Sequence, residues 1–226
     1  MESILVSGGA GYIGSHTIIE LLNENFNIIA LDNFSNSSSS SLEGIKQITD
    51  KDITFYEGDI LDTGILDTIF GSHKIDSVIH FAGLKAVGES TSKPLNYYHN
   101  NVSGTNQLLL SMKKYGVKKI VFSSSATVYG KPKKLPLHEN MVLENPTNPY
   151  GRSKVLIEQM LNDLYISDKD WNISILRYFN PVGAHVSGLI GENPKGIPNN
   201  LMPFISQVGI GKLKVLNVYG NDYDTQ

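Results

Sequence analysis

A tyrosine and a lysine stand four residues apart in the segment Tyr150-Gly151-Arg152-Ser153-Lys154. In a helix this spacing places both side chains on one face, one turn apart. Positive charge beside a phenol favours the phenolate, so the pair predicts a tyrosine that ionises easily and takes a proton from a hydroxyl group. By itself the pattern is weak, because a helix start with an aromatic residue and a solvated lysine has the same spacing.

A glycine-rich turn near the start of the chain gives this pair its context. A short apolar strand over residues 3–7 leads into Gly8, Gly11 and Gly14, and a helix follows from about Tyr12 to Asn23. Gly8 permits the tight turn, Gly11 lets backbone amides approach a pyrophosphate, and Gly14 lets the helix lie close to its strand. The pattern indicates a dinucleotide site.

An acidic residue completes that pattern. A second apolar strand over residues 27–31 ends at Asp32, eighteen residues beyond Gly14, close to the usual spacing of about twenty. We expect Asp32 to accept hydrogen bonds from an adenosine ribose. Its charge repels a 2′-phosphate, so the sequence favours NAD over NADP, and the nicotinamide ring adds a second positive charge beside Tyr150.

Composition excludes several other classes. The 226 residues are 40% hydrophobic with a net charge of −3, and no basic stripe interleaved with aromatic residues suggests nucleic acid as a partner. Lys131, Lys133 and Lys134 indicate only a surface loop. No signal peptide and no apolar run of about 18 residues point to a membrane. With no cysteine the chain lacks disulfides and thiolates, which fits a reducing, cytoplasmic location.

Apolar strands alternate with helical stretches along the chain. This order predicts an α/β fold with a doubly wound, Rossmann-like parallel sheet covered by helices on both faces. We expect an NAD-binding domain over residues 1–180 and the beginning of a substrate-binding lobe over residues 181–226. Further strands are expected at 53–56, 77–81, 119–123 and 173–179, with helices from about Leu95 to Lys114 and from Tyr150 onward. The serines between Ser35 and Ser41 read as a polar loop and a helix cap.

Polar residues follow several of these strands, at the edge where such sheets bind ligands. Asp59 either meets an adenine amino group or caps the helix that opens near Asp62. The small residues at 82–88 permit close approach of a flat cofactor, and Lys85 among them could reach an anionic or hydroxyl-bearing ligand. Ser125 would lie opposite Tyr150.

Two asparagines and two histidines complete the candidate residues. Asn180 and Asn200, the latter in an expected loop over 198–203, are plausible ligand donors. His80 and His99 lack a paired metal-ligand spacing, so we read both as structural or surface residues and expect no metal site.

At this point the sequence resembles the extended short-chain dehydrogenase/reductase family, and within it the enzymes that epimerise UDP-sugars at C4. The resemblance covers nearly all 226 residues. Its most specific stretches are residues 8–16, 80–90, 123–130 and 176–181.

The resemblance implies a reaction that composition could not. Bound NAD takes hydride from C4 of the hexose, the 4-keto sugar rotates, and hydride returns to its other face, which interconverts UDP-glucose and UDP-galactose. It implies that Tyr150 is the base, that Lys154 lowers the pKa of this tyrosine and binds ribose, and that Ser125 relays a proton to or stabilises the sugar oxygen. A homodimer built on the helices after Lys93 and at Tyr150 is a further implication.

The implied contacts extend around both ligands. With the glycine turn, Ala82 and Gly83, the cofactor contacts are Tyr12, Ile13, Asp32, Asn33, Asn36, Asp59, Ile60, Phe81, Lys85, Asn100, Ser125, Tyr150, Lys154 and Phe179. The substrate contacts are Lys85, Ser125, Tyr150, Asn180 and Asn200.

Two departures from the family pattern bear on the activity. Related dehydratases carry an Asp-Glu pair where this chain has Ala126-Thr127, so water elimination would lack its catalysts. The family continues for about a hundred residues beyond Gln226, and that part would supply the arginines for the diphosphate and the residue that gates N-acetylated sugars. The alternatives are another sugar-nucleotide oxidoreductase, such as a decarboxylase or reductase, and a non-catalytic NAD-binding protein.

Overall fold

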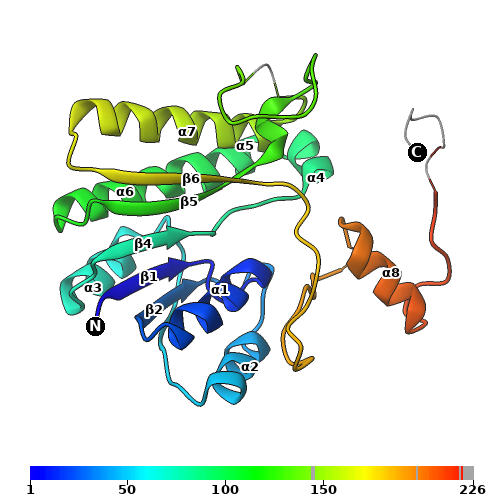
Figure 1. Cartoon of the computed structure of the whole chain (residues 1–226), viewed down its shortest axis with the longest axis horizontal. Helices are drawn as coiled ribbons and strands as arrows, with labels where there is room; N and C mark the ends of the chain where they lie inside the picture. Colours follow the sequence, from blue (N-terminus) through cyan, green and yellow to red (C-terminus); the bar gives the residue numbers. More distant parts are fainter. Residues whose placement is uncertain (144–145, 197, 219, 221–226) are drawn as a thin grey trace.

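The computed structural model describes residues 1–143, 146–196, 198–218 and 220. Its six strands form one parallel sheet in the order β3-β2-β1-β4-β5-β6 (Figure 1). The order reverses between β1 and β4, where a doubly wound sheet opens a crevice for ligands. The predicted fold class is confirmed. The strands are β1 Ser3–Ser7, β2 Asn27–Asp32, β3 Thr54–Glu57, β4 Ser77–His80, β5 Lys119–Ser125 and β6 Asn172–Tyr178.

Helices cover both faces of the sheet, because alternate strand residues point to opposite faces. Leu5 of β1 packs with residues of α3, α6 and α7, whereas Ile4 and Val6 pack with α1 and α2. The helices are α1 Tyr12–Asn23, α2 Ser40–Thr49, α3 Thr63–Ser72, α4 Val87–Ser92, α5 Pro94–Tyr97, α6 Gly104–Lys114, α7 Pro149–Ser167 and α8 Leu201–Gly209, with a 3₁₀ turn at Ala126–Tyr129.

The long helix expected from Leu95 to Lys114 is not uniform. A π-helical turn, Tyr98–Ser103, separates α5 from α6. Inside this turn the side chain of Asn101 accepts from the backbone N–H of Leu84 (2.8 Å) and donates to the Leu84 carbonyl (3.0 Å). Such wider turns are frequent at functional sites. Here the turn ties the helix to the loop after β4, a long-range contact that helical periodicity does not encode.

The stretch expected as a loop over 198–203 is also different. Leu201, Met202 and Pro203 belong to α8, which begins after Asn200 and stands away from the sheet in Figure 1. Leu201 (65%) and Met202 (42%) are exposed rather than packed in a core, so no buried apolar face marks this helix in the sequence.

The segment between β6 and α8 turns back over the first half of the sheet (Figure 1). Ile190 is only 5% exposed and packs with the apolar side chains of α1 and α2. Residues beyond 180 therefore contribute to the apolar core beside α1 and α2. Among the described helices, none has both the length and the apolar character that a membrane crossing requires.

Candidate functional site

A pocket of about 380 Å³ opens at the carboxyl edge of the sheet. Every residue that the sequence predicted for cofactor, substrate or chemistry lines it, from the glycine turn through Asp32, Lys85, Ser125, Tyr150 and Lys154 to Asn180 and Asn200. Phe179 lines the pocket as well, although it is 65% exposed. The fold thus brings together residues that are scattered over nearly 200 positions of the sequence.

The glycine turn has the geometry that its spacing predicted. Gly8 has φ +74° and donates its N–H to the carbonyl of Leu31 at 2.8 Å. A Cβ atom at Gly8 would lie 2.7 Å from the backbone nitrogen of Ala82, and one at Gly14 would clash with the Gly8 carbonyl oxygen. Both positions therefore need glycine, one for its left-handed backbone and one for close packing of α1.

The amino end of α1 faces the pocket. Tyr12, Ile13 and Gly14 form the first turn of the helix and line the cavity. Gly11 is the N-cap residue, and within the described part of the chain no side chain caps this helix. First-turn N–H groups lack partners within a helix and carry partial positive charge, so they suit a phosphate group.

Asp32 is held by donors from three parts of the chain. Its carboxylate accepts from the N–H of Ala10 (3.0 Å), the N–H of Phe34 (2.9 Å) and the hydroxyl of Ser37 (2.7 Å). A carboxylate has about four acceptor positions, so one is left for a ligand hydroxyl. These donors orient the Asp32 carboxylate at the pocket wall.

Asp59 does not cap a helix. Asp62 is the N-cap of α3, where Oδ1 accepts from the N–H groups of Gly64 (2.8 Å) and Ile65 (3.3 Å). Asp59 precedes that cap, and its carboxylate accepts from Asn33 Nδ2 (2.8 Å) and from the N–H of Leu61 (2.9 Å). The capping alternative is therefore wrong for Asp59, and its carboxylate joins Asn33 in the pocket wall.

Tyr150 and Lys154 share the first turns of α7. This helix starts at Pro149 because Asn148 caps it, accepting from the N–H of Gly151 at 2.8 Å. The Nζ atom of Lys154 lies 5.8 Å from the centre of the Tyr150 ring. It donates to the carbonyl of Ser123 at 2.7 Å, so the end of β5 fixes the ammonium group.

Ser125 ends β5 on the same side of the pocket. Its hydroxyl oxygen accepts from the N–H of Thr127 (3.2 Å) and from the Thr127 hydroxyl (3.0 Å). Both bonds use acceptor positions of Ser125 and leave its own proton for another group.

Burial sets the protonation of the tyrosine and lysine. It lowers the pKa of Lys154 to about 8, although the Glu158 carboxylate opposes the change. Burial also raises the pKa of Tyr150, and the Ser125 hydroxyl offsets part of this increase. Without the nicotinamide charge that the prediction included, burial outweighs the hydrogen bond from Ser125 in setting the pKa of Tyr150. Tyr97 packs edge-on against the Tyr150 ring, centroids 6.5 Å apart, and the Lys154 ammonium donates to a carbonyl rather than to the phenol.

His80 has a structural role, as predicted. Its ring bridges the hydroxyls of Ser7 (2.6 Å) and Thr105 (2.8 Å), and burial together with the Lys154 charge lowers its pKa to about 3. His99 is exposed. Within the described ranges, no cluster of three or more His, Asp or Glu side chains is arranged to hold a metal ion.

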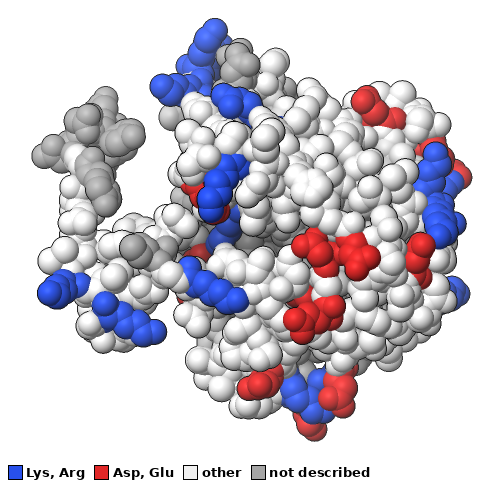
Figure 2. Space-filling model, turned by 180° about the vertical axis from the view of Figure 1, so that it is seen from behind, with Lys and Arg blue, Asp and Glu red and all other residues white. Residues whose placement is uncertain are grey.

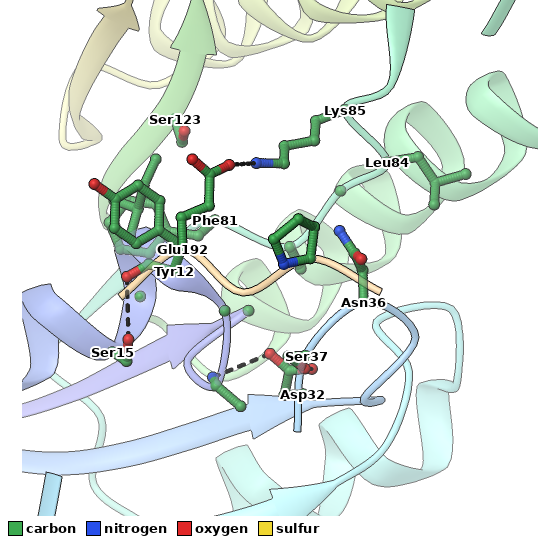
Figure 3. A pocket seen from close by; sticks show the side chains of 18 of the residues that line it. Tyr12, Ser15, Asp32, Asn36, Ser37, Phe81, Leu84, Lys85, Ser123 and Glu192 are labelled. Atoms are coloured by element: carbon green, nitrogen blue, oxygen red, sulfur yellow. Dashed lines mark hydrogen bonds and ion pairs between the residues drawn. The ribbon is translucent and has the colours of Figure 1, made fainter. Parts of the chain in front are cut away.

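Sequence reasoning missed several residues of the pocket. Ser37 and Ser41 belong to the serine run that was read as loop and cap, yet Ser37 anchors Asp32 and Ser41 donates to the Ala10 carbonyl at 2.7 Å. Their position directly after Asp32 was the available signal. Glu192 was not anticipated at all. It binds Lys85, 107 residues away in sequence (Figure 3), and no local pattern marks such a contact.

Comparison with known proteins places the chain in a family. Residues 4–223 match the NAD dependent epimerase/dehydratase family. The chain belongs to this family. It is 60% identical over 224 residues to the UDP-glucose 4-epimerase of Bacillus subtilis (strain 168), covering 99% of this chain and 66% of the relative. It is 56% identical over 231 residues to the human UDP-glucose 4-epimerase, covering 100% and 66%.

Solved structures of family members show the same arrangement of chain. The UDP-glucose 4-epimerase of Bifidobacterium longum, in complex with NAD+ and UDP, superposes with a TM-score of 0.96 at 56% identity over 99% of this chain and 67% of that one. The enzyme from Stenotrophomonas maltophila, with bound NAD and formylated UDP-arabinopyranose, has a TM-score of 0.95 at 47% identity over 100% and 67%. The resemblance predicted from the motifs is confirmed. The chain spans about 66% of the length of the curated relatives it matches.

Proposed function

We propose that the protein inverts C4 of the hexose of a UDP-sugar with NAD as its resident oxidant, and thereby interconverts UDP-glucose and UDP-galactose. One observation carries the proposal: Ser125, Tyr150 and Lys154 meet in the same pocket as the glycine turn and Asp32. The relatives named UDP-glucose 4-epimerase, at 56% and 60% identity, support the choice of substrate.

The residues of the pocket fit NAD. Because Gly8 and Gly14 have no Cβ atom, the turn packs closely against the Ala82 backbone and α1 packs closely against the turn. The first turn of α1 offers N–H groups to a diphosphate. Asp32 retains an acceptor position for a ribose hydroxyl, and Asn33 and Asp59 stand beside it. Gly83 and Lys154 line the opposite end, where a nicotinamide ribose would reach the ammonium group.

In this mechanism the side chains of the protein accept and return one proton. NAD, when bound, would supply the acceptor for hydride from C4 and its return to the opposite face. Tyr150 takes the proton from the hydroxyl at C4 as hydride leaves, which gives a 4-keto sugar, and returns the proton when hydride comes back. Lys154 favours the phenolate through its positive charge, and the Ser125 hydroxyl donates a hydrogen bond to the sugar oxygen without giving up its proton. Lys85, Asn180 and Asn200 orient the sugar nucleotide in the pocket.

The raised pKa of Tyr150 fits a base that acts only in the loaded site. Without a ligand, burial favours the protonated phenol of Tyr150. Positive charge brought close to the ring then favours the phenolate. Ionisation of Tyr150 is thereby coupled to the charge of the ligands beside it.

A non-catalytic NAD-binding protein is the second candidate, because the glycine turn and Asp32 would hold the cofactor whether or not Tyr150 acts as a base. The cofactor residues and the three catalytic candidates all lie within the matched part, which favours the enzyme. A homodimer, a cytoplasmic location and a domain boundary at residue 180 stay predictions. The exposed side chains of Leu156 and Ile166 on α7 are available for a dimer contact.

The decisive test is conversion of UDP-galactose by the purified, NAD-loaded chain, followed by chromatographic analysis of the hexose. Tyr150→Phe should bind NAD unchanged and lower turnover by roughly two to four orders of magnitude, the usual contribution of a positioned acid/base. Tyr165→Phe is the matched control, since Tyr165 lies on the same helix but is 44% exposed. Full activity of Tyr150→Phe would refute the assignment. NAD binding by the wild type without any conversion would favour the non-catalytic candidate.

A further inference from the structure

A segment over residues 183–195, here called the crossing segment, runs over the pocket and is attached at both ends. Near its start, the Tyr12 hydroxyl donates to the carbonyl of Gly183 at 2.7 Å. Near its end, Lys195 donates from its N–H to Asn36 Oδ1 (3.3 Å) and from Nζ to the Phe34 carbonyl (2.6 Å). These partners belong to α1 and to the loop after β2, two of the elements that carry predicted dinucleotide contacts.

Glu192 lies within the crossing segment and points into the pocket. Its Oε1 atom accepts from Nζ of Lys85 at 3.0 Å and from Nδ2 of Asn200 at 2.6 Å. Only 10% of the Glu192 side chain is exposed, compared with 49% for Lys85. Figure 3 shows the carboxylate turned toward the ammonium of Lys85, above the wall formed by Tyr12 and Phe81.

The charge of Glu192 needs an explanation. A nearly buried carboxylate is costly unless it is paired, and it repels the phosphate groups of both proposed ligands. Its field also contributes, after burial, to the raised pKa of Tyr12. Glu192 is therefore unsuited to bind a phosphate. Its two partners, however, are Lys85 and Asn200, which were predicted to contact the substrate.

These contacts join three separate elements. Lys85 belongs to the loop between β4 and α4, Asn200 precedes the first turn of α8, and Glu192 comes from the crossing segment. In the described part of the chain α8 stands apart from the sheet (Figure 1), so the bond from Asn200 is a direct link between its amino end and the pocket. Loss of the carboxylate would remove both links, the one from the crossing segment to the loop after β4 and the one to the amino end of α8.

We propose that Glu192 is a positioning residue that fastens the crossing segment over bound NAD and holds the Lys85 ammonium and the Asn200 amide toward the sugar nucleotide. The part concerning the sugar nucleotide rests on the proposed function, whereas the part concerning NAD needs only a dinucleotide in the pocket. Removing the charge should therefore speed NAD release and weaken substrate binding more than it slows the chemical step.

The first measurement is the rate of NAD release from the loaded chain without any sugar nucleotide. Glu192→Gln keeps the size of the side chain but removes the ion pair, and we expect release about tenfold faster, the effect of losing one charge-assisted hydrogen bond. Asp67→Asn is the matched control, because it removes the carboxylate of the exposed Lys114 pair (2.8 Å) away from the pocket. An unchanged rate in Glu192→Gln would overturn the proposal.

A second variant removes the exposed partner of the same ion pair, Lys85. Lys85→Met should also speed NAD release. Its own side chain is half-exposed and Glu192 keeps the bond from Asn200, so this variant keeps the test valid if Glu192→Gln folds poorly. In the double variant the two effects should combine to much less than their product, because both remove one interaction. Independent, multiplying effects would show that Glu192 does not act through Lys85.

The third measurement separates positioning from a general loss of structure. With UDP-galactose, Glu192→Gln should raise KM about tenfold and change kcat by less than about threefold, since binding contacts are displaced while Tyr150 is untouched. A fall in kcat at unchanged KM would overturn the substrate part of the proposal. If NAD release accelerates but no variant, nor the wild type, converts sugar, the proposed function fails while the role of Glu192 in holding NAD stands.

Discussion

Replacing Lys154 by methionine tests the electrostatic part of the proposed mechanism. The ammonium is 5% exposed, lies 5.8 Å from the centre of the Tyr150 ring and donates to the Ser123 carbonyl. Methionine fills similar space without charge. The phenolate form of Tyr150, which takes the proton from the sugar hydroxyl, would then lose the protein cation that favours it.

The size of the loss follows from Coulomb's law. Two unit charges 5.8 Å apart attract by about 3 kcal/mol at an effective dielectric constant of about 20. A change of 1.36 kcal/mol in a barrier is tenfold in rate, so Lys154→Met should lower kcat by about a hundredfold at pH 7. Assays at saturating NAD separate this effect from weaker cofactor binding.

The pH dependence makes the prediction more specific. Because the pKa of Lys154 is about 8, the wild type keeps the ammonium below that pH and loses it above. The ratio of wild-type to variant kcat should therefore be largest near pH 7 and shrink as pH rises past 8. The measurement is a pH profile of kcat for UDP-galactose conversion by both proteins.

A control and a contrary result complete the test. Lys169 lies 4.0 Å from the centre of the Tyr165 ring, an exposed pair of the same composition, and Lys169→Met should leave kcat unchanged. A kcat ratio that stays constant from pH 6.5 to 9.5, or the absence of any loss, would refute the electrostatic role of Lys154.

The remaining predictions concern stability and cofactor choice. Gly14→Ala should lower the free energy of unfolding by about 1–3 kcal/mol in urea denaturation, since the added methyl group clashes with the Gly8 carbonyl. Gly88→Ala is the control and should not lower it, because the space around Gly88 is open. Equal stability of the two variants would contradict the packing argument. Asp32→Ala should weaken NAD more than NADP in calorimetric titration, because it removes both an acceptor and a repelling charge, and an equal loss would undercut this specificity. The free energy of unfolding of the wild type should rise relative to that of Lys154→Met between pH 8 and 10. The reason is that Lys154 loses its proton near pH 8 in the folded state and only near 10.5 in the unfolded state. Parallel curves for the two proteins would contradict the burial of this charge.

Local patterns were sufficient for much of the fold. The glycine turn, α1, β2 and the start of α7 lie close to their predicted positions, because each depends on neighbours within a few residues: φ at Gly8, apolar periodicity, and the cap at Asn148. The pocket was also predictable, since parallel strands bring their carboxyl ends to one edge.

Long-range contacts explain what was missed. The π-helical turn at Tyr98–Ser103 coincides with the bonds between Asn101 and Leu84, and α8 projects from the sheet where little packs against it. Figure 2 shows both basic and acidic side chains on one face of the molecule. The composition gives only the net charge, not where these side chains lie.

The sequence by itself determined which chemical groups this protein has and how they are spaced along helices and strands. Only the tertiary structure decided their surroundings: the burial that raises the pKa of Tyr150, the carbonyl that holds Lys154, and the carboxylate of Glu192 beside Lys85. The reason is physical. Spacing is a property of neighbouring residues, whereas desolvation and Coulomb interactions depend on every group that the fold brings near, however distant in the chain.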